Sequence, residues 1–172
     1  MSLDTLDDLL VQQLRDLYSA ERQIVRTLPK LVKASANAAL VQAFQDHLAQ
    51  TEQHVKRLVE CFRILKSTAR GPKCQAMAGL LEEGGEMLRM SGDAGVRDAG
   101  IIADAQRVEH YEMSAYGTSI ALARLLGHRD VVKQLEATLE EERAADARLT
   151  EIAQQQLYPS LPTAGAPHEA AA

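Results

Sequence analysis

Polar side chains interrupt the apolar stripes of four long amphipathic segments, at positions where a helix would face a protein core. On a helical wheel of about 100° per residue, these residues are Glu21, His47, His54, Glu109, Glu112, Glu142 and Asp146. An ionised carboxylate alone in an apolar core is very costly, and no Lys or Arg falls mid-stripe beside these acids. A divalent metal would supply the missing positive charge. Carboxylate oxygen with imidazole nitrogen suits iron, manganese or zinc.

Each of these residues also has a simpler interpretation. Taken alone, Glu21 fits a partly exposed flank, and His47 fits a hydrogen-bonded histidine of the core. Glu142 closes a run of three glutamates that could form a solvated face. The E-x-x-E pair of Glu109 and Glu112 is common on helices by chance. Agreement across four segments favours the metal interpretation, in which every long helix directs at least one ligand inward; the wheel places His54 nearer the edge of its stripe.

The segments that must position these residues show helical periodicity throughout. Apolar residues recur at three- and four-residue steps over about 3–36, 38–65, 74–90, 96–126 and 130–156. Pro29 lies inside the first segment and predicts a kink or a restarted turn. The pattern predicts an all-α fold, a four-helix bundle with one additional short helix. We expect this bundle domain to span 1–158, followed by a flexible Pro/Ala-rich tail over 159–172.

Composition agrees with a helical domain and narrows its partners. The chain has 172 residues, 46% of them hydrophobic and 3% aromatic, which favours helices packed through aliphatic side chains. The formal net charge is -5 and no Lys/Arg block stands out, so we expect no nucleic-acid partner. The first residues are acidic and no apolar run is long enough to cross a bilayer, so we expect a cytoplasmic protein without membrane contact. Cys61 and Cys74 are expected to be semi-buried thiols, although their spacing would permit a disulfide.

The sequence also predicts the surroundings of four further polar residues. Asp98 is mid-stripe but falls in the first turn of its segment, so we expect it to serve that helix N-terminus. Tyr116 shares the face of the proposed ligands, and hydrogen bonding and plain packing suit it equally. His110 and His128 point away from that face or lie in a loop, and are expected at the surface.

Five stretches of the chain resemble the YciE/YciF family of bacterial stress-associated ferritin-like proteins. They are DLYSAERQ (16–23), HLAQTEQHVKRL (47–58), KCQAMAGLLEEG (73–84), VRDAGIIADAQRVEHYEMSAYGT (96–118) and LEATLEEERAADARLT (135–150). The resemblance implies a ferritin-like fold, a homodimer and similarity to the di-iron domain of rubrerythrin. It also implies that Glu21 is the first-helix ligand, that Glu109 and Glu112 form a ligand pair, and that Glu142 begins the E-x-x-H of the last helix.

The chain departs from the family pattern at two ligand positions. Thr51 stands where the second helix would carry the glutamate of its E-x-x-H, and the neighbouring Glu52 falls at the outer edge of the stripe. On the last helix, Ala145 stands where the histidine would be, and Asp146 is the nearest substitute. The site is therefore expected to be asymmetric, or weaker, or to hold one metal ion where relatives hold two.

Three functions follow from these expectations. The first is a metal-binding stress protein that oxidises Fe(II) with dioxygen or peroxide, with two irons per chain and manganese or zinc as other occupants. The second is a non-enzymatic helical dimer, a structural or interaction module whose site is vestigial or holds zinc. The third is storage in a ferritin-like cage, which nothing in the sequence specifies. A ferroxidase or peroxidase-like activity rests on the fold alone, and any electron donor must be another molecule because the chain lacks a four-cysteine module.

Overall fold

Four long helices and one short helix make up the part of the chain that the computed structural model describes, residues 3–163. The helices are α1 (Leu6–Ala34), α2 (Ala38–Ile64), α3 (Gln75–Met87), α4 (Ala94–Leu125) and α5 (Arg129–Ile152). A π-helical turn (Ala153–Leu157) and a 3-10 turn (Tyr158–Ser160) follow α5. No strand occurs among these residues, so the predicted all-α bundle is confirmed.

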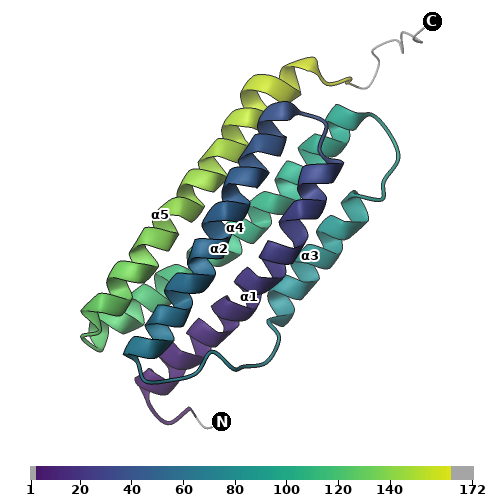
Figure 1. The fold of residues 1–172 in the computed structure, drawn as a ribbon. Helices are drawn as coiled ribbons and strands as arrows, with labels where there is room; N and C mark the ends of the chain where they lie inside the picture. The colour runs from purple at the N-terminus through teal and green to yellow at the C-terminus, as the bar shows by residue number, and fades with distance from the viewer. Residues whose placement is uncertain (1–2, 164–172) are drawn as a thin grey trace, which may run out of the picture.

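The bundle is built from two antiparallel hairpins joined by one long crossover. Helices α1 and α2 form the first hairpin and α4 and α5 form the second (Figure 1). The connection from α2 to α4 runs the length of the bundle and contains α3, which packs on α4 and α1 from outside. A four-helix bundle with one long crossover is the arrangement of ferritin-like folds.

Side-chain caps fix where three helices begin. The hydroxyl of Thr5 accepts from the Asp8 N–H at 3.1 Å, and the Asp8 carboxylate accepts from the Thr5 N–H at 2.9 Å. The side chains of Asn37 and Asp93 likewise accept from N–H groups in the first turns of α2 and α4. Such caps each contribute about 1 kcal/mol to stability. Helix α1 continues through Pro29 from Leu6 to Ala34, so the helix is not restarted there.

A polar layer at mid-length divides the apolar core into two clusters. In α1, Leu14 and Leu17 belong to one cluster and Ile24 and Leu28 to the other, with Glu21 between them. The other three long helices repeat the pattern: apolar residues of one cluster, then buried polar residues, then apolar residues of the other cluster. The two clusters hold the polar layer away from water on both sides.

The expectation for Asp98 was wrong about which backbone it serves. Its carboxylate is fully buried and accepts from the Ala36 N–H at 3.0 Å and from the Asn37 N–H at 2.7 Å. These N–H groups belong to the turn between α1 and α2, while Asp93 caps α4 itself. The first turn of α4 lies beside that turn, so the carboxylate satisfies donors across the fold.

The described chain continues a few residues past the domain end predicted at 158. Leu161 packs against the core beside the first turn of α4, where a Cβ atom at Gly95 would come within 2.6 Å of the Leu161 side chain. Most of the predicted tail, 164–172, lies outside the described residues, as do residues 1–2. Within residues 3–163, each helix is either too short or too polar to span a membrane.

Candidate metal centre

Six potential ligands from all four long helices meet in the polar layer. They are Glu21 of α1, His47 and His54 of α2, Glu109 and Glu112 of α4, and Glu142 of α5. Four of the six side chains are 0% exposed, while Glu109 is 3% and His47 is 6% exposed. They face inward because each lies on the buried face of its helix, in the middle part of the bundle.

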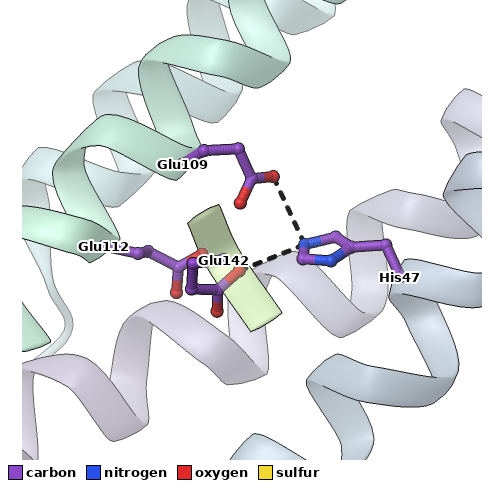
Figure 2. Close-up of side chains that lie close together, drawn as sticks. All are labelled: His47, Glu109, Glu112 and Glu142. Atoms are coloured by element: carbon purple, nitrogen blue, oxygen red, sulfur yellow. Dashed lines mark ion pairs between the residues drawn. The ribbon is translucent and has the colours of Figure 1, made fainter. Parts of the chain in front are cut away.

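The six side chains form two overlapping groups. His47, Glu109, Glu112 and Glu142 offer ligand atoms that all lie within 4.8 Å of one another (Figure 2). Glu21, His54 and Glu142 form the second group under the same limit. Glu142 belongs to both, so one of its oxygens can serve each group. Glu142 would therefore help to hold an ion in each group.

Each histidine has one nitrogen close to carboxylate oxygens, and the two histidines approach different oxygens of Glu142. His47 Nε2 is 3.3 Å from Glu109 Oε1 and 3.8 Å from Glu142 Oε2. His54 Nδ1 is 2.9 Å from Glu142 Oε1 and 3.4 Å from Glu21 Oε1. Each group of the layer therefore contains one imidazole nitrogen among its carboxylate oxygens.

The buried polar atoms of this layer test whether metal ions fit. Neither carboxylate oxygen of Glu112 or of Glu142 has a hydrogen-bond partner among the described residues. The same holds for one oxygen each of Glu21 and Glu109 and for His54 Nδ1. Buried polar groups are otherwise almost always hydrogen-bonded. Metal ions would coordinate these atoms, and the mixed oxygen and nitrogen donors suit iron, manganese or zinc. The residues present therefore fit the implied metal pair.

Charge leads to the same conclusion. Four carboxylates share the layer, and no Lys or Arg within residues 3–163 forms an ion pair with any of them. Among the described residues, His47 and His54 are the only potential cations that form ion pairs with these carboxylates. Two divalent ions carry four positive charges, which equals the charge of four ionised carboxylates. Without such ions the layer must hold protons instead.

Burial sets the proton affinity of the metal-free layer. It raises the pKa of Glu109 and of Glu112 well above the usual range, and neighbouring carboxylates add to the effect. Burial alone would lower the pKa of His54, but Glu142 and Glu21 outweigh it and raise the pKa to about 10. Burial lowers the pKa of His47, which favours the neutral form that binds metal. Metal binding must therefore release protons from this layer.

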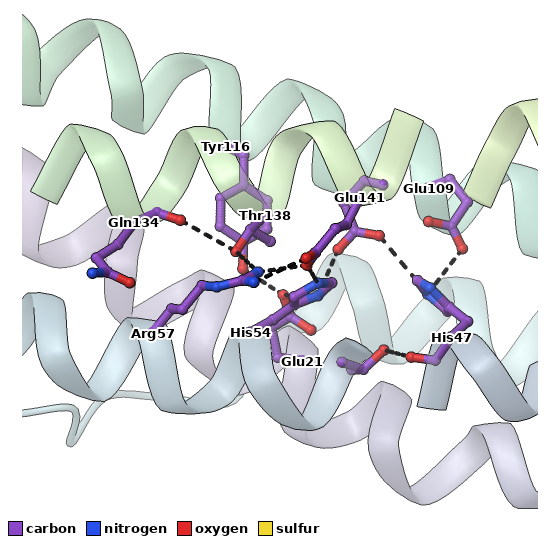
Figure 3. Close-up of polar contacts among 11 residues, drawn as sticks. Glu21, His47, His54, Arg57, Glu109, Tyr116, Gln134, Thr138 and Glu141 are labelled. Carbon is purple, nitrogen blue, oxygen red and sulfur yellow. Dashed lines mark hydrogen bonds and ion pairs between the residues drawn. The ribbon is translucent and has the colours of Figure 1, made fainter. Parts of the chain in front are cut away.

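An outer carboxylate holds the His54 ring. His54 Nε2 lies 2.8 Å from Glu141 Oε2, so its other nitrogen faces the ligand layer (Figure 3). Arg57 donates to both oxygens of Glu141 and to the Thr138 hydroxyl. This carboxylate–histidine pairing orients metal-binding imidazoles in many proteins. Sequence reasoning missed Glu141 because the three-glutamate run suggested only a solvated face; the spacing of His54 and Arg57, one turn apart, was the available signal.

Two neighbours of the layer clarify open expectations. Tyr116 is fully buried and its hydroxyl donates to Glu21, so it hydrogen-bonds as well as packs. Thr51 occupies the inward position expected of a glutamate, and its hydroxyl donates to the His47 carbonyl at 2.7 Å. Glu52 is exposed and lies outside the layer. Helix α2 therefore offers two histidines to the layer and no carboxylate.

Asp146 is the one predicted ligand that the fold does not bring into the layer. Its Oδ1 accepts from Gln106 Nε2 at 2.9 Å and lies 3.4 Å from His110 Nε2. Four residues beyond Glu142, it lies about 6 Å further along the helix and rotated by about 40°, so it faces the polar edge of α4. His54, placed near the stripe edge by the wheel, is fully buried. Whether the other six residues bind metal stays a prediction.

Two histidines and two cysteines lie outside the ligand layer. His110 is exposed, while the half-buried His128 lies 3.0 Å from Asp7. Cys61 and Cys74 are both free, and both are buried rather than semi-buried.

Comparison with known proteins agrees with this architecture. The family described as "Domain of unknown function (DUF892)" matches residues 5–160. Protein YciF of Escherichia coli (strain K12) is 45% identical over 156 residues, 89% of this chain and 93% of that protein. The crystal structure of the E. coli stress protein YciF superimposes with a TM-score of 0.85 at 43% identity, covering 88% of this chain and 96% of that chain.

Two further solved structures extend the comparison. YcfI of Rhodopseudomonas palustris gives a TM-score of 0.83 at 43% identity, covering 87% of this chain and 97% of its own. A Xanthomonas campestris protein at 17% identity, with a TM-score of 0.70 over 86% of this chain and 90% of its own, shares the fold alone. The resemblance predicted from the sequence is confirmed: this chain belongs to the DUF892 family and is similar over most of its length to YciF.

Proposed function

We propose that this protein binds two divalent metal ions, iron foremost, and oxidises Fe(II) with dioxygen or peroxide. One observation carries the proposal: the converging nitrogen and oxygen atoms of the layer are buried and close together, and most of them have no hydrogen-bond partner among the described residues. Four carboxylates in that position also require positive charge that no Lys or Arg side chain among residues 3–163 supplies by an ion pair.

The protein's own residues would prepare the site for this reaction. When bound, the iron pair supplies the electron transfer to oxygen species. Glu142 belongs to both groups and would help to hold both ions. His47 and His54 give each group one nitrogen ligand. The apolar clusters on both sides exclude water, which strengthens every charge interaction within the layer.

The assembly and location are part of the same proposal. We propose a homodimer, as the family resemblance implies, and a location in the cytoplasm. Light scattering during size-exclusion chromatography should give twice the 18.8 kDa chain mass. A particle of several hundred kilodaltons would instead indicate a storage cage.

A second function is favoured by a specific observation. The His54 side chain lies between the carboxylates of Glu21 and Glu142, and its raised pKa keeps it positively charged at neutral pH. The metal-free layer is therefore partly neutralised by its own residues. Such neutralisation would let the bundle stay folded without iron, as required of a helical dimer that serves as a structural or interaction module with a zinc-occupied or empty site.

The experiment that separates the two functions starts with metal content. The protein is purified without chelator or affinity metal, analysed for metals, stripped, and titrated anaerobically with Fe(II) before oxygen is admitted. Saturation near two ions per chain and a ferric absorbance that grows on aeration support the proposed oxidation. A double variant, Glu109→Ala with Glu142→Ala, should lose both, while Glu52→Ala with Glu140→Ala, two exposed helical glutamates, should lose neither. A folded dimer that binds no Fe(II) would contradict the proposal.

A further inference from the structure

Two kinds of cavity reach the ligand layer from different sides of the bundle. The first is a cleft of about 260 Å³ between α2 and α5 that ends at His47 and Glu109. Its outer walls carry polar groups, among them Gln42, Gln50 and Arg148. The second is a pair of smaller cavities between the bundle and α3. His47 and Glu109, the only ligands with measurable exposure, lie where both kinds end.

The cavities beneath α3 adjoin one another. The inner cavity, about 30 Å³, is bounded by His47 and Glu109 at one end. The outer cavity, about 90 Å³, lies between α3 and the α1 and α4 helices. Both are lined by Thr27, Leu31, Leu81, Ala105 and Val108. These shared walls make the pair a continuous series from the α3 side to the ligand layer.

The walls of this series are apolar almost throughout. Thr27 is the only hydroxyl, and it donates to the Gln23 carbonyl at 3.0 Å, so it has no hydrogen left to offer a guest. Lys30 and Asp104 line the outer cavity, and the polar groups of the inner cavity besides Thr27 are the ligands His47 and Glu109 at its end. Apolar cavities that are closed to solvent stay dry and take up apolar guests such as xenon, and the largely apolar lining of this series favours the same guests. Each is larger than the roughly 10–15 Å³ that a water-sized guest requires.

The helix that covers the outer cavity is the least embedded of the five. Met77 is its single fully buried residue. Gly84 and Gly85 line the cavity and contribute no side chain to its wall. Elements with few buried contacts open at low free energy. Small movements of α3 can therefore admit a small guest while the four-helix core stays intact.

We propose that the paired cavities beneath α3 form an apolar passage that brings dioxygen to the ligand layer, separate from the polar α2–α5 cleft that admits Fe(II) and peroxide. Dioxygen is a small apolar molecule, and a dry passage favours it over water, peroxide and ions. This inference rests on the proposed oxidation, because it assigns the oxidant of that reaction its own route. The two routes meet at His47 and Glu109, where the reactants would combine.

Xenon binding tests the passage without any metal. Crystals of the metal-free protein pressurised with xenon should show xenon in the paired cavities. Ala105→Leu projects a larger side chain into both cavities and should remove that xenon. Ala145→Leu, the same substitution in the wall of the polar cleft, should leave the xenon in place. Leu81→Trp provides a second blocking variant should Ala105→Leu not fold.

Kinetics of the loaded protein test the route. In Ala105→Leu, oxidation of bound Fe(II) by dioxygen should slow roughly tenfold, equivalent to about 1.4 kcal/mol of barrier. Its oxidation by peroxide and the anaerobic association rate of Co(II) should stay within about twofold of wild type. Ala145→Leu should give the reverse: slower Co(II) association and slower peroxide oxidation, with an unchanged dioxygen step.

The outcomes separate this inference from the proposed function. Absence of xenon from the wild-type cavities, or a dioxygen rate unaffected by a variant that excludes xenon, overturns the passage. Xenon binding in a protein that takes up no metal overturns the proposed oxidation and leaves the gas site in place. A dioxygen rate reduced equally by Ala105→Leu and Ala145→Leu shows one shared entrance and overturns the separate routes.

Discussion

Replacement of Glu112 by methionine should stabilise the metal-free protein and weaken its response to metal. Glu112 is 0% exposed, neither of its oxygens has a hydrogen-bond partner among the described residues, and burial raises its pKa well above the usual range. A buried polar group without a partner costs about 1–3 kcal/mol, more when charged. Methionine has a similar length and removes this penalty, so the free energy of unfolding of the metal-free variant should rise by about that amount.

The expected size of the effect is within reach of thermal denaturation. For a chain of this length, each kcal/mol shifts Tm by about 2–4 °C, so Tm of metal-free Glu112→Met should rise by about 2–12 °C. Loss of a ligand should lower metal affinity by at least the roughly 10–100-fold that loss of an outer partner costs. The increase in Tm that saturating Zn²⁺ or anaerobic Fe(II) produces in wild type should shrink correspondingly.

The control is Glu52→Met, the same substitution at an exposed position of α2. It should leave both Tm values close to wild type. A Glu112→Met protein that is less stable without metal, yet gains as much from metal as wild type, would refute the reasoning. Glu112 would then be a satisfied structural acid rather than a ligand.

Three further predictions follow from the site and its supports. Glu141→Gln removes the charge that holds His54 and should lower metal affinity roughly 10–100-fold with unchanged stoichiometry, measured by chelator competition; an unchanged affinity would remove Glu141 from the site. Because the pKa of His54 rises from 6.5 to about 10 on folding, the metal-free protein should lose stability as pH rises between these values, while the Tm increase produced by metal grows. The raised pKa of Glu109 acts in the same direction. Thermal-shift measurements across this pH range test the prediction, and a Tm that does not change with pH, with or without metal, would contradict it. Asp98→Ala removes the acceptor of the Ala36 and Asn37 N–H groups and should lower the free energy of unfolding by about 1.5–3 kcal/mol per charged hydrogen bond lost, in chemical denaturation, without changing metal stoichiometry.

The apolar pattern predicted most of the fold and the centre of the site. The five helices begin and end within a few residues of the predicted limits because Leu and Ile periodicity marks the buried faces. Glu21, Glu109, Glu112 and Glu142 could be placed inward because each interrupts such a face. A single-helix wheel contains that information completely.

The rest of the site depends on relations between helices. The wheel put His54 near an edge, but the approach of α1 and α5 buries it fully. Asp146 lies on nearly the same face of α5 as Glu142, but it is one turn further along the helix, where its carboxylate contacts Gln106 of α4 and not the ligands. The sequence pattern predicts Glu141 as a surface charge, but in the folded bundle it contacts His54 and Arg57 of α2. Packing height and partner identity are properties of the assembled bundle, and no local pattern encodes them.

The buried Asp98 carboxylate has a consequence for the order in which the bundle assembles. It joins the α1–α2 turn to a helix 61 and 62 residues later in the chain. The first hairpin can therefore form early through local contacts, but its turn stays unsatisfied until the start of α4 arrives. Contacts so distant in sequence form late and slow the folding of a chain. The loop that this contact closes contains α2 and the crossover with α3, so a longer crossover should slow folding while leaving the finished four-helix core unchanged.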